Sequence, residues 1–156
     1  VLVSLAYAET DMRRCLERSV GLIPRDSEYA SVLLFALDRC RDGNFEGAWA
    51  ACEREYRRYN WVHAYPNAAA EVVSLWFGEG DFDETMRLIA ACGQDVDCNA
   101  AQIATALGAL RGSSAIAARW TVPIGDTIRT YLRGFRELSL RKLAERTVLA
   151  ARRQAR

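Results

Sequence analysis

The pattern of hydrophobic and polar positions along the chain predicts helices almost throughout. Apolar residues recur at spacings of three and four over residues 45–56, which is typical of an amphipathic helix. Residues 67–78 are apolar on nearly every side, so we expect this helix, with Asn67 as its N-cap, near the centre of the fold. The Ala- and Gly-rich stretch 99–111 predicts a second central helix that other helices can approach closely, and Gly112 is its expected C-cap.

Capping and helix-breaking residues place the remaining elements, and no stretch shows the sustained alternation of a hairpin. Further helices are predicted near the N-terminus, before Pro24, from Asp26 or Ser27 towards Gly43, over residues 82–92, from about Asp126 to Arg133 and after Ser139. We therefore expect an all-α fold, a compact orthogonal bundle of about eight helices with short connections. No linker is evident, so residues 1–156 are predicted to form a single all-helical domain.

Composition and charge are those of an ordinary globular protein. Hydrophobic residues make up 51% of the chain and charged residues 26%, and the formal net charge is +1. Basic residues gather in the C-terminal stretch RKLAERTVLAARRQAR, which we interpret as the solvated face of a last helix because an apolar stripe runs through it. No apolar run reaches the roughly 18–20 residues of a membrane span. We therefore expect neither a nucleic acid nor a membrane as a partner.

The five cysteines are odd in number and show no CxxC spacing, and His63 is the only histidine. This pattern favours neither a disulfide framework nor a structural zinc site, and it is typical of a reducing, cytoplasmic compartment. The opening stretch VLVSLAYAET has no basic n-region of a signal peptide. It also starts within a helix-like pattern and without Met, so we expect the chain to be part of a longer protein.

The stretch GQDVDCNAA at residues 93–101 places Asp95 and Asp97 directly before a run of small residues. Two carboxylates about 5 Å apart repel by roughly 3 kcal/mol at an effective dielectric constant of about 20, so solvent, a helix dipole or a cation has to offset the repulsion. In one interpretation Asp97 is an N-cap and Asp95 is a solvated loop residue. In the other, the turn aims both carboxylates at Mg²⁺ or Mn²⁺. Residue spacing does not decide between them.

Five stretches of the chain resemble segments of a known protein family in sequence, order and spacing. They are IPRDS at Ile23, VHAYPNAA at Val62, LWFGEGDFDE at Leu75, GQDVDCNAAQIATALGALRG at Gly93, and Ile116–Trp120. In these stretches, from Leu22 onward, the chain resembles the C-terminal half of the ADP-ribosylglycohydrolase family, all-helical Mg²⁺-dependent enzymes that remove ADP-ribose from proteins and related conjugates. The Gly-x-Asp-x-Asp motif followed by a helix of small residues is the most specific of them.

The resemblance implies that Asp95 and Asp97 are ligands of a dinuclear Mg²⁺ or Mn²⁺ site. The position that follows is usually Thr in the family and also reaches a metal. Here it is Cys98, and a neutral thiol is a poor ligand for Mg²⁺. The family's Thr-Asp-Asp motif, which supplies the other ligands, is not found in this chain. We therefore expect the N-terminal half of the same protein to be a partner that completes the metal site.

The implied activity is hydrolysis of an N- or O-glycosidic bond in an ADP-ribosylated protein or a small ADP-ribose conjugate. Such a reaction builds positive charge on the sugar, and a metal pair can hold the ribose hydroxyls and orient water. His63 is a candidate substrate contact, although a hydrogen bond within its own loop would equally explain it. Asn67 is a second candidate contact, with the N-cap role as its alternative. The catalytic base is unassigned, and we expect the isolated chain, with half a metal site, to be inactive.

A competing hypothesis makes this chain a catalytically inactive helical interaction module, either a degenerate homologue or a fragment of tetratricopeptide-like repeats. GNFEGAWAAC at Gly43 and GDFDETMRLI at Gly80 share a Gly-x-Phe-acid start at a spacing close to that of such repeats. The segments between the two copies do not repeat, and an array of this kind needs at least three copies.

Overall fold

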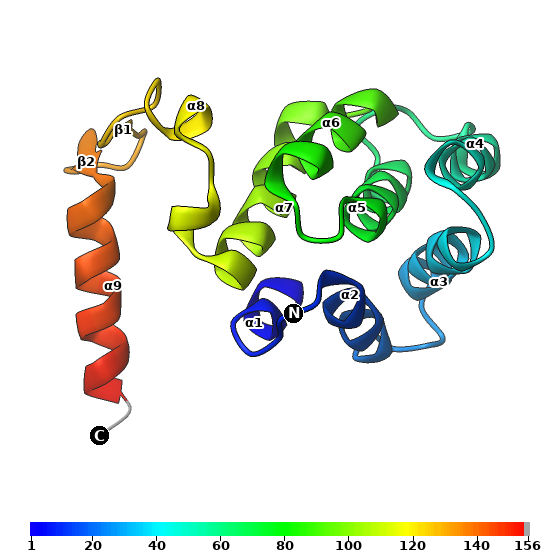
Figure 1. The fold of residues 1–156 in the computed structure, drawn as a ribbon, viewed down its shortest axis with the longest axis horizontal. Helices are drawn as coiled ribbons and strands as arrows, with labels where there is room; N and C mark the ends of the chain where they lie inside the picture. Colours follow the sequence, from blue (N-terminus) through cyan, green and yellow to red (C-terminus); the bar gives the residue numbers. More distant parts are fainter. Residues whose placement is uncertain (155–156) are drawn as a thin grey trace. The chain divides into compact units, whose positions relative to one another are not determined.

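Helices make up most of the regular structure in residues 1–154, the part of the chain that this computed structural model describes (Figure 1). In chain order the elements are α1 (Leu2–Ala6), α2 (Met12–Gly21), α3 (Glu28–Arg41), α4 (Phe45–Tyr56), α5 (Ala64–Gly78), α6 (Phe82–Cys92), α7 (Val96–Arg111), the 3₁₀ turn η1 (Ser113–Ala115), α8 (Ala118–Thr121), β1 (Thr127–Arg129), β2 (Glu137–Ser139) and α9 (Leu140–Gln154). The prediction of an all-α fold is confirmed, with one small hairpin added.

The chain divides into two compact units after Ile116. The first unit holds α1 to α7 and η1, and the second holds α8, the hairpin and α9. This division differs from the undivided chain that the sequence pattern suggested, and the expectation of a single domain stays a prediction. In the second unit no side chain is buried up to Gln154, so these residues contain no hydrophobic core of their own.

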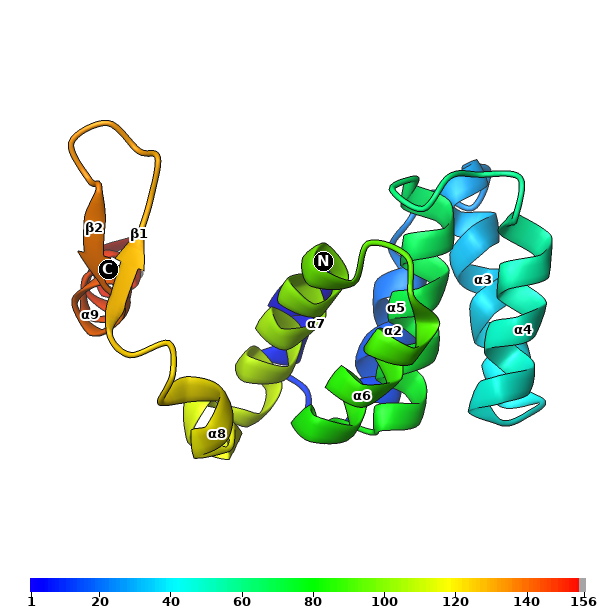
Figure 2. The same ribbon diagram turned by 90° about the horizontal axis from the view of Figure 1, so that it is seen from above.

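The first unit is built around α5, which packs against α2, α3, α4, α6 and α7 (Figures 1 and 2). Ala68, Ala69 and Ala70 of α5 are buried and bring neighbouring backbones close, and a Cβ atom added at Gly78 would lie 2.0 Å from Oγ1 of Thr85 on α6. The prediction of a central helix is confirmed for α5, whereas α7 packs against α1, α5 and α6 with one side and exposes the other. The side chains of Val73, Ile103 and Leu107 are all buried.

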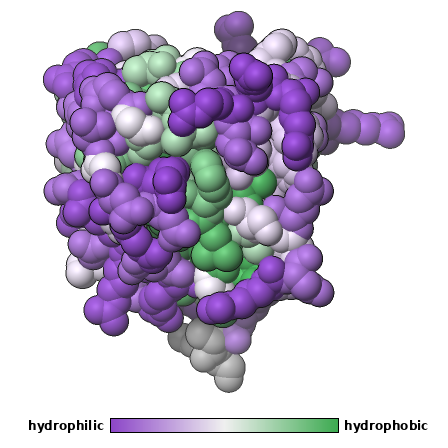
Figure 3. All heavy atoms as spheres, turned by 90° about the vertical axis from the view of Figure 1, so that its right-hand side faces the viewer, coloured by the Kyte–Doolittle hydropathy of each residue, from purple (hydrophilic) through white to green (hydrophobic). Residues whose placement is uncertain are grey.

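Side chains at the helix N-termini explain where most of the helices in this unit begin. Ser27 caps α3 by accepting a hydrogen bond from the Ala30 amide, and Asn44 caps α4 by accepting one from Gly47. These two helices form one side of the unit, on which hydrophobic side chains are exposed between hydrophilic ones (Figure 3). Leu34 of α3 is 40% exposed.

The helix expected from about Asp126 to Arg133 is wrong, because these residues form the first strand and the turn of a hairpin. Thr127 pairs with Ser139 and Arg129 with Glu137 in an antiparallel register. Asp126 accepts hydrogen bonds from the Ser139 hydroxyl at 2.6 Å and from the Arg141 amide at 2.9 Å. The carboxylate thereby ties the start of β1 to the start of α9, which begins after Ser139 as predicted.

None of the helices in the described residues combines the length and the apolar character that crossing a membrane requires.

Candidate metal centre

A tight turn brings the chain from α6 into α7. Gly93 and Gln94 both have positive φ angles, 70° and 65°, so the backbone reverses within two residues. Asp95 is the N-cap residue of α7, and its side chain makes no capping hydrogen bond. The proposal that Asp97 is the N-cap is therefore wrong, since Asp97 lies in the first turn of the helix. Both carboxylates are left available for another role.

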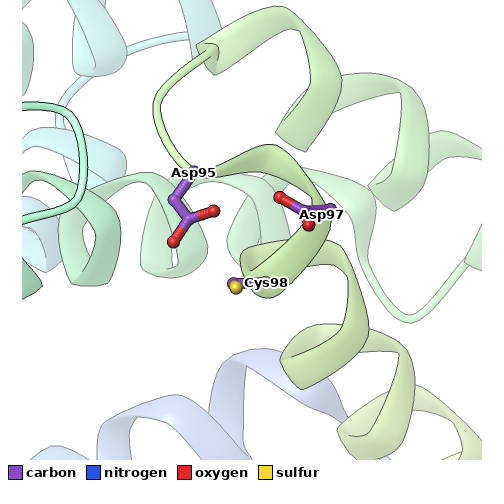
Figure 4. A group of neighbouring side chains, drawn as sticks. All are labelled: Asp95, Asp97 and Cys98. Atoms are coloured by element: carbon purple, nitrogen blue, oxygen red, sulfur yellow. The ribbon is translucent and has the colours of Figure 1, made fainter.

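Side-chain donor atoms of Asp95, Asp97 and Cys98 lie within 4.8 Å of one another. Figure 4 shows the three side chains gathered at the start of α7. Asp97 and Cys98 are exposed and Asp95 is partly exposed, so water and ions have access to them. The positive end of the helix dipole offsets part of the repulsion between the two carboxylates.

The donor set suits a hard cation at two of its three positions. Carboxylate oxygens are preferred ligands of Mg²⁺ and Mn²⁺. The pKa of the Cys98 thiol is raised, first by a hydrogen bond to Asp95 and then by the negative charge of that carboxylate. Cys98 is therefore a neutral thiol at neutral pH, which fits a hard cation poorly.

Asn67 holds the backbone of this cluster in place from α5. Its side chain is buried, and its Oδ1 atom accepts hydrogen bonds from the Asp95 amide at 3.0 Å and from Nδ2 of Asn99 at 2.6 Å. Its Nδ2 atom donates to the carbonyl oxygens of Trp61 and His63, at 2.8 and 2.9 Å. These four bonds use the full capacity of a carboxamide. Asn67 therefore connects the loop before α5 to the turn before α7.

The N-cap role predicted for Asn67 is wrong, because α5 begins three residues earlier at Ala64 and His63 is its N-cap. The earlier start is possible because Pro66 falls in the first turn, where a missing amide hydrogen costs nothing. Asn67 thus lies inside the helix, with its Oδ1 atom directed at the start of α7 and its Nδ2 atom at the carbonyl oxygens of Trp61 and His63. Its expected role as a substrate contact stays a prediction.

His63 lies in a group of aromatic side chains beside this connection. Its Nδ1 atom accepts a hydrogen bond from the Tyr65 amide at 3.2 Å, so the local explanation for this histidine is correct. The His63 ring stacks on Tyr59 with 4.2 Å between centroids, and it meets Tyr65 edge-on at 4.7 Å. The Tyr65 hydroxyl donates to Glu28 at 2.9 Å, and Trp61 is 62% exposed. His63 remains partly exposed, so a contact with a ligand is sterically open.

Sequence reasoning missed Tyr59, Tyr65 and Glu28 as members of this group. The spacing of Tyr59 and His63 was the only local signal, because Glu28 comes from α3 and is brought to Tyr65 by the fold. A further carboxylate was also missed, that of Glu71, which is half-buried one turn after Asn67 on α5.

The all-helical fold agrees with the comparison of the chain with known protein families. The model of the ADP-ribosylglycohydrolase family matches residues 1–156, so the chain belongs to this family and is of hydrolase type. The sequence resemblance was seen from Leu22 onward, and the match extends it back to the N-terminal residue Val1. No curated protein and no solved structure matches the chain. Whether residues 1–156 correspond to the C-terminal half of the family's fold stays a prediction.

Proposed function

We propose that this chain supplies two carboxylate ligands to a Mg²⁺ site in a hydrolase that cleaves an N- or O-glycosidic bond of ADP-ribose or a related conjugate. The proposal rests on the convergence of two carboxylates in a chain of this family. Asp95 and Asp97 converge at the start of α7, neither serves as a helix cap through its side chain, and the chain belongs to the ADP-ribosylglycohydrolase family.

Two carboxylates account for part of an octahedral Mg²⁺ shell, and water or other protein ligands complete it. We propose that the N-terminal half of the same protein brings the remaining carboxylates, and with them the second ion of a dinuclear site. When bound, the metal pair would stabilise charge and orient water at the anomeric carbon. Mn²⁺ accepts the same oxygen ligands and is the alternative ion.

The residues around the cluster have a positioning role in this proposal. Asn67 holds the Asp95 amide and the Asn99 side chain, so the turn that carries the first carboxylate is anchored to the central helix. A ligand that is already oriented loses less conformational entropy when the ion binds. The positive end of the α7 dipole offsets part of the repulsion between the two carboxylates before an ion binds.

The loop that Asn67 holds through Trp61 and His63 is the proposed substrate contact. Trp61 is largely exposed, and His63 and Tyr59 offer a stacked pair of rings. Planar rings of this kind stack on the face of a nucleotide base. We propose that an ADP-ribosylated protein or a small ADP-ribose conjugate binds here, with its ribose directed at the carboxylates.

Replacement of Asp97 by Asn tests the metal proposal. Asn keeps the shape of the side chain but removes an anionic ligand, so Mg²⁺ affinity should fall at least tenfold and hydrolysis by the complete protein should fall with it. The matched control is Glu46→Gln, because Glu46 is the second residue of α4 as Asp97 is of α7, and it is exposed. Unchanged metal affinity and activity in Asp97→Asn would rule out the ligand role.

The half-site part of the proposal needs a second experiment. Residues 1–156 are purified and assayed for release of ADP-ribose from a modified protein in Mg²⁺, with and without the N-terminal half of the protein. The isolated chain should be inactive and should bind Mg²⁺ weakly through its two carboxylates. Full turnover by the isolated, monomeric chain would show that it contains a complete active site.

The alternative function, an inactive interaction module, is favoured by the lack of buried side chains in the second unit up to Gln154. Leu140 and Leu143 lie on the same face of α9 and are both exposed. The repeat version of this alternative loses its main support in the structure. Phe45 and Phe82 each follow an Asn or Asp N-cap, so the shared Gly-x-Phe sequence is accounted for by two similar helix starts.

A further inference from the structure

A pocket of about 480 Å³ lies in the first unit where α1, α2, α3, α5 and α7 meet. Its volume is within the range of sites that hold small molecules, about 300–1,000 Å³. Most of the lining is aliphatic and comes from all of these helices. The aliphatic side chains include Leu2, Leu16, Val20, Leu33, Val72 and Ile103.

One carboxylate, that of Glu71 on α5, lines this apolar pocket. Among residues 1–154 no hydrogen bond or ion pair reaches it. Burial raises the pKa of Glu71 to about 7, and no neighbouring cation counteracts the effect. The pKa of Tyr29, which also lines the pocket, is raised by its own burial and then by the charge of Glu71. An ionised carboxylate in such surroundings is costly unless a cation pairs with it.

The other polar side chains of the pocket do not supply that cation, and the N-terminal amino group of Val1, which also lines the pocket, is not among the causes that shift the pKa of Glu71. Ser19 donates its hydroxyl hydrogen to the Leu16 carbonyl oxygen, and Thr105 donates to the Ala101 carbonyl oxygen. Gln102 is uncharged. The pocket therefore combines an apolar wall, room for a small molecule and one negative charge without a counter-ion.

We infer that this pocket binds a small ligand carrying an amine or guanidinium group on an apolar body, with the Glu71 carboxylate as its counter-ion. The apolar body replaces water along the aliphatic walls, and the cation forms charge-assisted hydrogen bonds to the carboxylate. The site is separate in its chemistry from the cluster of Asp95 and Asp97, since it requires no metal ion.

Calorimetric titration of residues 1–156 at pH 8, where Glu71 is ionised, tests the inference with two probes. Benzamidine carries a fixed positive charge, and benzamide has nearly the same shape and is neutral. Benzamidine should bind at least tenfold more tightly than benzamide. In Glu71→Gln the affinity for benzamidine should fall at least tenfold, whereas the affinity for benzamide should change by less than twofold.

Two further variants separate this site from the metal centre and from unspecific charge effects. Asp97→Asn, measured without Mg²⁺, should bind benzamidine as the unmodified chain does, so the outcome does not depend on the proposed hydrolase activity. Glu46→Gln removes an exposed charge on α4 and should also leave binding unchanged. Equal affinities for the two probes, absence of binding at millimolar concentration, or undiminished benzamidine binding in Glu71→Gln would overturn the inference.

Discussion

Replacement of Asn67 by Ala should destabilise the first unit and weaken metal binding together. The change removes four hydrogen bonds at once, to the Asp95 amide, the Asn99 side chain and the carbonyl oxygens of Trp61 and His63. Of the groups left behind, the Asn99 carboxamide has almost no access to water and the Asp95 amide is part-buried.

The magnitude follows from the partners that lose their bonds. A buried polar group left unsatisfied costs about 1–3 kcal/mol, and a bond that water can replace costs less. The Asn99 carboxamide and the Asp95 amide each lose a bond of the first kind, and the carbonyl oxygens of Trp61 and His63 each lose one of the second kind. Together these losses should lower the free energy of unfolding by about 3 kcal/mol. For a chain of this length the melting temperature should fall by roughly 10 °C.

Asn60→Ala is the matched control, because Asn60 lies in the same loop and is exposed. Its Oδ1 atom accepts a single hydrogen bond, from the Val62 amide at 3.1 Å. The control should lose less than about 1 kcal/mol in the free energy of unfolding. Both variants are compared by urea denaturation and by Mg²⁺ titration. Mg²⁺ affinity should fall in Asn67→Ala and stay constant in Asn60→Ala.

Two results would refute this reasoning. A loss of stability in Asn67→Ala no larger than that in Asn60→Ala would mean that the four hydrogen bonds are exchanged for water without cost. Unchanged Mg²⁺ affinity in a destabilised Asn67→Ala would mean that the Asp95 turn keeps its geometry without the anchor. Asn67 would then have a structural role only.

Three further changes test other parts of the structure. Because the folded-state pKa of Glu71 is raised from 4.5 to about 7, the folded protein binds more protons than the unfolded chain between these values. Stability should therefore fall by about 3 kcal/mol as the pH rises through this window, and urea denaturation at pH 4 and pH 8 should show no such fall in Glu71→Gln. Gly78→Ala places a Cβ atom 2.0 Å from Oγ1 of Thr85, so the variant should lose about 3 kcal/mol in the free energy of unfolding, and Thr85→Ala in the same chain should restore part of it. Cys98→Ser exchanges a thiol for a hydroxyl oxygen, so Mg²⁺ affinity should rise at constant stability, and an unchanged affinity would mean that this side chain does not face the ion.

Local pattern in the sequence determined most of the helices and the composition of the candidate metal cluster. Residues 45–56 and 99–111 have a helical spacing of apolar residues and helix-ending signals that hardly depend on the rest of the chain. Gly112 is the C-cap of α7, as predicted, and its φ angle is 80°. Asp95 and Asp97 could be recognised as a pair because a helix start brings neighbours in the sequence together in space. The resemblance to a known family then favoured a ligand role over a cap role, which spacing alone does not do, and the ligand role stays a proposal.

The tertiary structure decided which side chains act together over long distances in the sequence. Asn67 was assigned to a helix start because a cap is the local use of such a residue, whereas its partners Asp95 and Asn99 come from α7. The segment after Asp126 has a short helical pattern, but its pairing with Ser139 turns it into a strand. Glu71 looked like one polar residue on an apolar helix. Only the fold places its carboxylate on the wall of an apolar pocket, where burial raises its pKa and no cation from a neighbouring helix pairs with it.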